Sequence, residues 1–393
     1  MVFHLFSRCQ REIRAVTCSD VRALTSDFSH PIGRPANRGL VCALALLAWA
    51  VGSVPPASAQ RGLTAENAVA PLEQVSPDLN ARLVGLERAQ GVMFGALIAG
   101  KGTVDEADLF RRMNQRLADT GSSARPDPEA DKGFAALGAP AAAIIRRAHA
   151  FQREVAAVFA GIPPEHRKGV LDAAVARYRS RPDQSLPDAA KDMTILYDHP
   201  YTSFIPPTPP ATEPRRKLAY PTLTGFVWSA HWYELAALQP LETFDDPAAR
   251  DADLATVAER LKRKLSFGKP PDAFPTELPL APAIAPGLVA LHERSAAIID
   301  NLNVMQDVLI DILVRSDVPD PRATVNEIVA QFTNREYRCV QADEWIVVAL
   351  RHSIFEQGGP AVGTMEQDER NAFSGGHGQH YAVRRAPPPC TPE

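Results

Sequence analysis

The chain has 393 residues, 45% of them hydrophobic, and carries 42 lysines and arginines against 46 aspartates and glutamates, which leaves a formal net charge of −4 at pH 7. Such a composition is typical of a globular protein. The acidic balance argues against nucleic acid as a partner, because binding to phosphates needs a positive field. We expect residues 60–370 to form one helical domain, with 200–221 as the place where it could subdivide.

The N-terminal part reads as a targeting segment. Residues 39–51, GLVCALALLAWAV, form a short apolar run that follows two arginines and precedes the small-residue pattern Ala-Ser-Ala. This order predicts a signal peptide over residues 34–59 that is cleaved before Gln60. A membrane span needs about 20 apolar residues. We therefore expect no stable membrane span after cleavage, a periplasmic or secreted protein, and a non-structural extension over residues 1–33 that could reflect a misassigned start.

Apolar residues at helical spacing recur through the rest of the chain, and capping residues, prolines and glycines mark where the helices begin and end. The predicted helices cover residues 76–100, 103–121, 139–161, 163–178, 188–196, 223–238, 246–267, 286–315, 320–332 and 344–357, with a polar linker at 121–133. The best strand candidate, 337–340, is too short to build a sheet. The predicted class is all-α: an irregular multi-helix bundle with two proline-rich connections, 200–221 and 270–286, and a disordered tail over 371–393.

The longest amphipathic pattern lies at residues 286–315. Its apolar residues recur at steps of three, four or seven, which places them on one side of a helix. The opposite stripe consists of His292, Asp300, Asn303, Asp307 and Asp311. A histidine and carboxylates on one stripe could hold a metal ion, or they could form a solvated face. In the second case, replacing Asp307 by alanine would change the free energy of unfolding by no more than about 0.5 kcal/mol.

No H-E-x-x-H, G-x-S-x-G, C-x-x-C or C-x-x-C-H motif is present, which removes the commonest zinc protease, serine hydrolase, thioredoxin and c-type haem interpretations. Histidines that stand beside acids on predicted helices remain as candidates, because helix bundles build metal sites from such pairs on facing helices. The candidate metal ligands are His231, Glu234, His292, His352 and Glu356. Each could equally be an ordinary polar residue of an amphipathic helix.

The segment from Tyr197 to Glu234 is the candidate ligand-binding surface. It joins a proline-rich stretch to the densest aromatic cluster of the chain, and we expect the stretch to fold over the aromatic helix and leave a cleft with polar groups at its rim. The candidate ligand-binding residues are His199, Tyr201, Trp228 and Trp232. The alternative is that these aromatic side chains only pin a long connection to the core.

Two cysteines, Cys339 and Cys390, remain after signal cleavage, and in an exported protein they could form one disulfide or stay as free thiols. Taken together, the sequence indicates an exported all-helical protein that binds a protein or small-molecule ligand and has no recognisable catalytic motif. The alternative is a metal- or haem-dependent periplasmic enzyme or carrier. The sequence names neither the ligand nor a cofactor.

Overall fold

The computed structural model describes residues 69–101, 103–118, 125–192, 195, 220–266 and 279–352. All of them belong to one unit of the chain, Leu63–Glu393. The predicted signal peptide and the predicted C-terminal tail lie outside the described residues. Most of the proline-rich connection at 200–221, with His199 and Tyr201 beside or within it, lies outside them too.

The fold is all-α, as predicted. The helices are α2 (Leu72–Val75), α3 (Pro77–Ala99), α4 (Glu106–Ala118), α5 (Pro128–Ala136), α6 (Ala139–Gly161), α7 (Pro164–Arg179), the 3-10 helix η4 (Pro182–Gln184), α8 (Pro221–Ala236), α9 (Leu238–Thr243), α10 (Pro247–Ser266), α11 (Ala281–Ile284), α12 (Pro286–Leu313), α13 (Pro321–Thr333) and α14 (Ala342–His352). No helix among these described elements is both long enough and apolar enough to cross a membrane.

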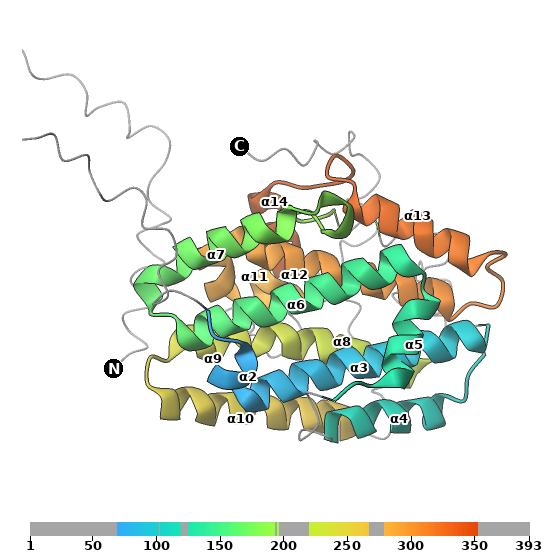
Figure 1. Cartoon of the computed structure of the whole chain (residues 1–393), viewed down its shortest axis with the longest axis horizontal. Helices are drawn as coiled ribbons and strands as arrows, with labels where there is room; N and C mark the ends of the chain where they lie inside the picture. The colour runs from blue at the N-terminus through green and yellow to red at the C-terminus, as the bar shows by residue number, and fades with distance from the viewer. Residues whose placement is uncertain are drawn as a thin grey trace, which may run out of the picture. The chain divides into compact units, whose positions relative to one another are not determined.

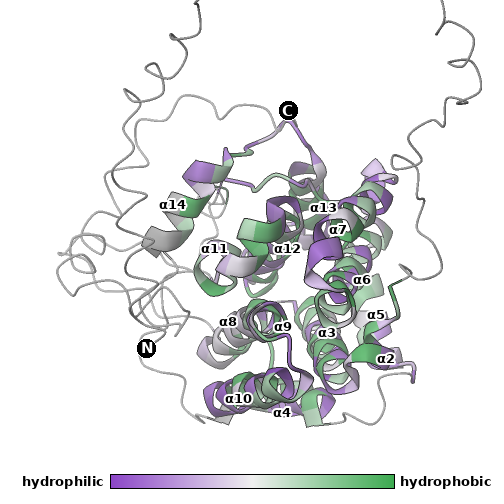
Figure 2. Cartoon of the chain, turned by 90° about the vertical axis from the view of Figure 1, so that its left-hand side faces the viewer, coloured by the Kyte–Doolittle hydropathy of each residue, from purple (hydrophilic) through white to green (hydrophobic). Residues whose placement is uncertain are grey.

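The helices are stacked in layers, which both views of the chain show (Figures 1 and 2). α4 and α10 lie at one side, followed by α3 with α8 and then by α6 with α12; α7, α13 and α14 lie beyond them. The four helices α3, α6, α8 and α12 therefore occupy the middle of the bundle.

The predicted linker at 121–133 is partly wrong, because α5 begins inside it. Asp127 caps this helix: its carboxylate accepts hydrogen bonds from the backbone N–H groups of Glu129 and Ala130, each at 3.1 Å. Proline at the first helical position costs no hydrogen bond there. The signal for the helix was thus present in the sequence, as Asp127 followed by Pro128.

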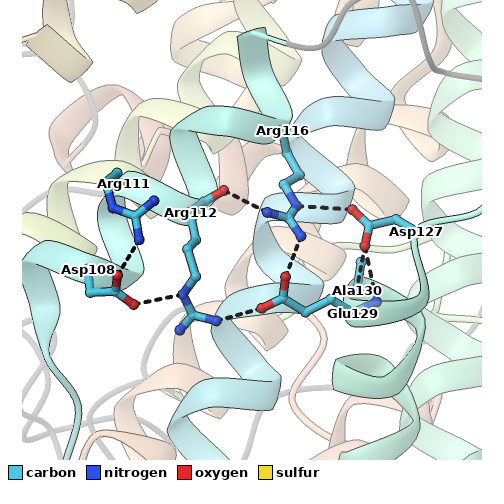
Figure 3. Close-up of polar contacts among 7 residues, drawn as sticks. All are labelled: Asp108, Arg111, Arg112, Arg116, Asp127, Glu129 and Ala130. Carbon is cyan, nitrogen blue, oxygen red and sulfur yellow. Dashed lines mark hydrogen bonds and ion pairs between the residues drawn. The ribbon is translucent and has the colours of Figure 1, made fainter.

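Ion pairs tie the start of α5 to α4 (Figure 3). Arg116 of α4 contacts Asp127 at 3.0 Å and also pairs with Glu129. Arg112, one turn earlier, contacts Glu129 at 2.5 Å and Asp108 at 3.0 Å. The network is half-exposed, so we ascribe to it the orientation of α5 on α4 more than a large stabilisation.

Glycines let α3 and α5 approach each other closely. A Cβ atom added to Gly133 would lie 1.7 Å from the carbonyl oxygen of Gly91, and one added to Gly91 would lie 2.7 Å from the carbonyl oxygen of Ala130. No side chain fits between these backbones. The two helices can therefore pack this closely only because both residues are glycines, which have no Cβ.

From Ser295 onward α12 is buried on every side, so the solvated-face alternative for its polar stripe is wrong. From Ser295 to Leu313 every residue is buried, and His292 is too. The polar residues Asp300, Asn303 and Asp307 are each only 2% exposed. The apolar stripe is buried as predicted, but on the opposite face Asp300 contacts α11 and α14 and Asp307 contacts α8. A period in one helix does not reveal such neighbours.

The predicted helix at 188–196 is also wrong over residues 188–192, which are not helical. Asn301 of α12 takes over the backbone groups of this segment. Its amide nitrogen donates to the carbonyls of Pro187 and Ala189, each at 2.9 Å, and its oxygen accepts from the Lys191 N–H at 2.8 Å. Lys191 also forms an isolated antiparallel bridge with Cys339, inside the short strand candidate 337–340.

Candidate functional site

A cluster of polar side chains lies inside the four central helices. Each helix contributes polar residues three or four positions apart, a spacing that places them on one face. The polar cluster consists of Glu87 and Gln90 on α3, His149 and Gln152 on α6, His231 and Glu234 on α8, and Asn303, Gln306 and Asp307 on α12. All except Glu87 are 2% exposed or less, and the side chain of Glu87 is 18% exposed.

Gln306 is the centre of the polar cluster. Its amide nitrogen donates to Gln90 Oε1 at 2.9 Å and lies 3.3 Å from Nε2 of His149. Its amide oxygen lies 3.2 Å from Nε2 of His231. Because an amide N–H₂ can only donate and an amide oxygen can only accept, His149 accepts through Nε2 and His231 donates from Nε2. One side chain thereby joins α3, α6, α8 and α12.

Because Nε2 of each histidine is bound to Gln306, the other ring nitrogen, Nδ1, faces away from Gln306. His149 must carry its proton on Nδ1 when it is neutral, and this atom lies 3.7 Å from a carboxylate oxygen of Glu87. Nδ1 of His231 lies 3.4 Å from Oδ1 of Asp307. Each histidine is therefore placed between Gln306 and a carboxylate on a neighbouring helix.

His231 and Asp307 form the more deeply buried of the two pairs, with side chains 1% and 2% exposed. Burial lowers the pKa of His231, but Asp307, Glu234 and Gln306 outweigh it and the net shift is upward. Burial also raises the pKa of Asp307, and the nearby His231 offsets only part of that rise. Proton uptake is therefore favoured at both members of the pair, which have to be treated as one coupled unit.

Glu87 behaves differently. Burial raises its pKa, but His149 and Arg153 outweigh this effect and lower the pKa to about 2. Arg153 forms an ion pair with the carboxylate. The carboxylate of Glu87 therefore stays ionised, and Arg153 balances its charge. Across the cluster, Gln152 donates to Glu234 Oε2 at 3.2 Å.

Asn303 is the least satisfied member of the polar cluster. Neither its amide nitrogen nor its amide oxygen has a hydrogen-bond partner among the described residues, although the residue is 2% exposed. The amide nitrogen of Gln90, in the same cluster, also lacks a partner there. Each such group costs about 1–3 kcal/mol, so their presence in one core calls for a reason.

The structure separates the predicted metal ligands. His231 and Glu234 belong to the polar cluster, whereas the hydrogen bonds of His292 are to other groups. The side chain of His352 and all of Glu356 lie outside the described residues. In the part of the chain that the structure describes, no three histidine, cysteine, aspartate or glutamate residues are grouped so that they could hold a metal ion.

His292 has a structural role at a kink. Its backbone is non-helical, with φ −154° and ψ 78°. Its Nδ1 accepts from the N–H of Ser295 at 3.2 Å, and its Nε2 lies 3.1 Å from Oδ1 of Asp172 on α7. The imidazole therefore acts as the N-cap of the longer, second part of α12.

Of the four predicted ligand-binding residues, the structure describes Trp228 and Trp232, whereas His199 and Tyr201 lie outside the described residues. Trp228 and Trp232 are buried in α8, 7% and 1% exposed. His231, between them, is 0% exposed and so does not lie at the rim of a surface cleft. Cys339 is disulfide-bonded, and its partner lies outside the described residues, where Cys390 also lies; the pairing of these two cysteines stays a prediction.

Sequence reasoning missed Glu87, Gln90, His149, Gln152 and Gln306. A signal for them does exist, because His149 and Gln152 are polar residues three positions apart in the alanine-rich helix α6. The same spacing occurs in the other central helices. Neutral amides attract little notice in a sequence, yet here they connect the charged residues.

Comparison of the chain with protein-family models, curated proteins and solved structures finds no match to any of them. The fold and the site alone define the class: an all-α helix bundle with a hydrogen-bonded polar cluster in its core.

Proposed function

We propose that this protein is an exported, non-catalytic binding protein and that its ligand site is the polar cluster. The observation that carries the proposal is Asn303, whose two amide atoms are buried without a partner among the described residues. Apolar side chains of similar volume would avoid that cost. A ligand that binds there would supply the missing hydrogen bonds.

The chemistry of the cluster restricts the ligand. Asn303 offers one acceptor and one donor, whereas Oδ1 of Asp307 already faces Nδ1 of His231 at 3.4 Å. The ligand we propose is a small polar molecule that both donates and accepts hydrogen bonds. Because the polar cluster contains carboxylates but no lysine or arginine, it favours a neutral or cationic molecule over an anion.

Native mass spectrometry of the mature protein, purified from the exported fraction, tests the proposal. We expect a non-covalent adduct that is lost in Asn303→Leu, while the melting temperature stays the same or rises because an unpaired buried amide is removed. Asn326→Leu is the matched control, since Asn326 is an exposed asparagine of α13, and it should keep the adduct. A wild-type protein without an adduct, together with a marked loss of stability in Asn303→Leu, would mean that the cluster is only structural.

A metal- or haem-dependent carrier or enzyme is the second candidate. It is favoured by two contacts between histidine and carboxylate on facing helices: His231 with Asp307 at 3.4 Å and His149 with Glu87 at 3.7 Å. A metal would need a further ligand, either by movement of Glu234 or from residues outside the described part. Elemental analysis and an absorption spectrum of the mature protein separate the two candidates, because a bound metal or haem would be lost in His231→Ala.

A further inference from the structure

A second feature, unrelated to the polar cluster, lies at the C-terminal end of α10. Arg260, Arg263 and Lys264 are three or four positions apart and so lie close together on this helix. The two arginines are exposed. In a chain of net negative charge, this is a local concentration of positive charge.

Lys264 is held against two indole rings. Its Nζ lies 5.0 Å from the ring centroid of Trp228 and 4.7 Å from that of Trp232, a cation–π arrangement with α8. The residue is half-buried. Burial, followed by repulsion from Arg260 and Arg263, lowers the pKa of Lys264. The ammonium is thus partly removed from water and surrounded by like charge.

No carboxylate pairs with Arg260, Arg263 or Lys264 among the described residues, although Lys262 in the same turn contacts Glu259 at 3.7 Å. Cations near a helix C-terminus interact favourably with the helix dipole, by about 0.3–1 kcal/mol. That interaction explains the exposed Arg263 but supplies no hydrogen-bond acceptor to the half-buried ammonium. Charges in such positions are normally paired.

The indole N–H of Trp232, beside Lys264, is a second donor without a hydrogen-bond partner among the described residues. It is buried, the residue being 1% exposed. The same indole ring contacts the ammonium of Lys264. An N–H donor without an acceptor and an ammonium that has aromatic contacts but no carboxylate partner among the described residues therefore belong to neighbouring side chains.

We propose that α8 and α10 form a binding site for a small oxyanion such as phosphate, with Lys264 as its anchor. An anion would accept hydrogen bonds from the ammonium and the guanidinium groups and would offset their mutual repulsion. Charge-assisted hydrogen bonds of this kind are the strong ones. The site is separate from the polar cluster and does not depend on what that cluster binds.

The test is a titration of the mature full-length chain with sodium phosphate at pH 7, at constant ionic strength set with sodium chloride. Because Lys264 contacts two of the tryptophans, we expect a saturable change in tryptophan emission and a rise in melting temperature. Lys264→Met should abolish both effects, and Arg263→Gln should weaken the affinity roughly tenfold. Lys132→Met, at an exposed lysine of α5, is the matched control and should respond like the wild type.

A response that does not saturate, or that is equal in Lys264→Met and the wild type, overturns the proposal. Vesicles of anionic and of zwitterionic phospholipid form a second arm. Binding to anionic vesicles without a saturable response to inorganic phosphate would also overturn the small-anion site and would indicate a membrane surface instead. If Lys264→Met fails to fold, as judged by circular dichroism, Arg263→Gln decides the outcome.

Discussion

Removing the carboxylate of Asp307 should strongly destabilise the protein. Asp307 lies 3.4 Å from His231, and both side chains are almost completely buried. Breaking a buried charged pair by removal of one partner costs about 3–5 kcal/mol, because the other charge is left in the core without compensation. Asp307→Ala should therefore cost as much as the core truncation Leu302→Ala, for which about 2–5 kcal/mol is expected. A solvated face would instead give about 0.5 kcal/mol or less.

The pair can be separated from its surroundings by a double-mutant cycle. His231→Leu combined with Asp307→Leu replaces both partners by apolar side chains and leaves no isolated charge. We expect the double variant to be clearly more stable than the sum of the single losses predicts, by about 1 kcal/mol or more. Gln306 will lose its bond to His231 in the double variant, so some destabilisation should remain.

Urea unfolding of the mature protein at pH 7, followed by far-UV circular dichroism, measures these free energies. Asp317→Ala is the control, since Asp317 follows α12 and its side chain is 61% exposed; it should change stability by about 0.5 kcal/mol or less. An Asp307→Ala variant as stable as this control would refute the reasoning. Burial lowers the pKa of His231, but its acidic neighbours outweigh this and raise it. The contribution of His231 to the stability of the fold is therefore complete below pH 6.5, the ordinary histidine pKa, and is lost as pH rises through the folded pKa.

Four further outcomes are expected. Gly133→Ala should destabilise the protein severely in thermal unfolding, because a Cβ there would lie 1.7 Å from a backbone oxygen. Gly169→Ala should instead stabilise α7 by about 0.5–1 kcal/mol, because a Cβ there would meet nothing within 4 Å. Burial lowers the pKa of His292, so the free energy of unfolding should fall as pH falls from 6.5 through the folded pKa. His292→Asn keeps a capping oxygen but does not titrate, so urea unfolding of this variant should depend less on pH. Burial lowers the pKa of Lys191 to about 7 from 10.5, so the free energy of unfolding should rise as pH rises between those two values. If Lys191→Met shows the same dependence on pH, this prediction is wrong. N-terminal sequencing of exported protein should begin at Gln60, and material that keeps the preceding apolar run would disprove cleavage.

The sequence by itself determined the class of fold and most of the helices. Helix ends depend on local chemistry, such as Ser76-Pro77 before α3 and Asp320-Pro321 before α13, and local chemistry is legible without a structure. The apolar stripe of α12 was also correctly identified as core. These features involve residues close together in the chain, so the folded neighbours add little to them.

Only the tertiary structure decided what covers the other side of α12. Asp300, Asn303 and Asp307 have the spacing of a solvated stripe, but each is only 2% exposed. Asp300, for example, accepts hydrogen bonds from the N–H of Ala281 at 2.9 Å and from the indole of Trp345 at 3.1 Å. Hydrophobic periodicity records which face is apolar and does not reveal whether a polar face meets water or another helix.

Four residues of the polar cluster were named from the sequence alone: His231, Glu234, Asn303 and Asp307. His231 and Glu234 could be singled out because they are ionisable and share a helix face. Gln306 could not, since a glutamine in an apolar helix has no property that sets it apart in the sequence. Its importance arises from contacts with Gln90, 216 positions away, and His149, 157 positions away, and contacts at such separations exist only after the helices have packed.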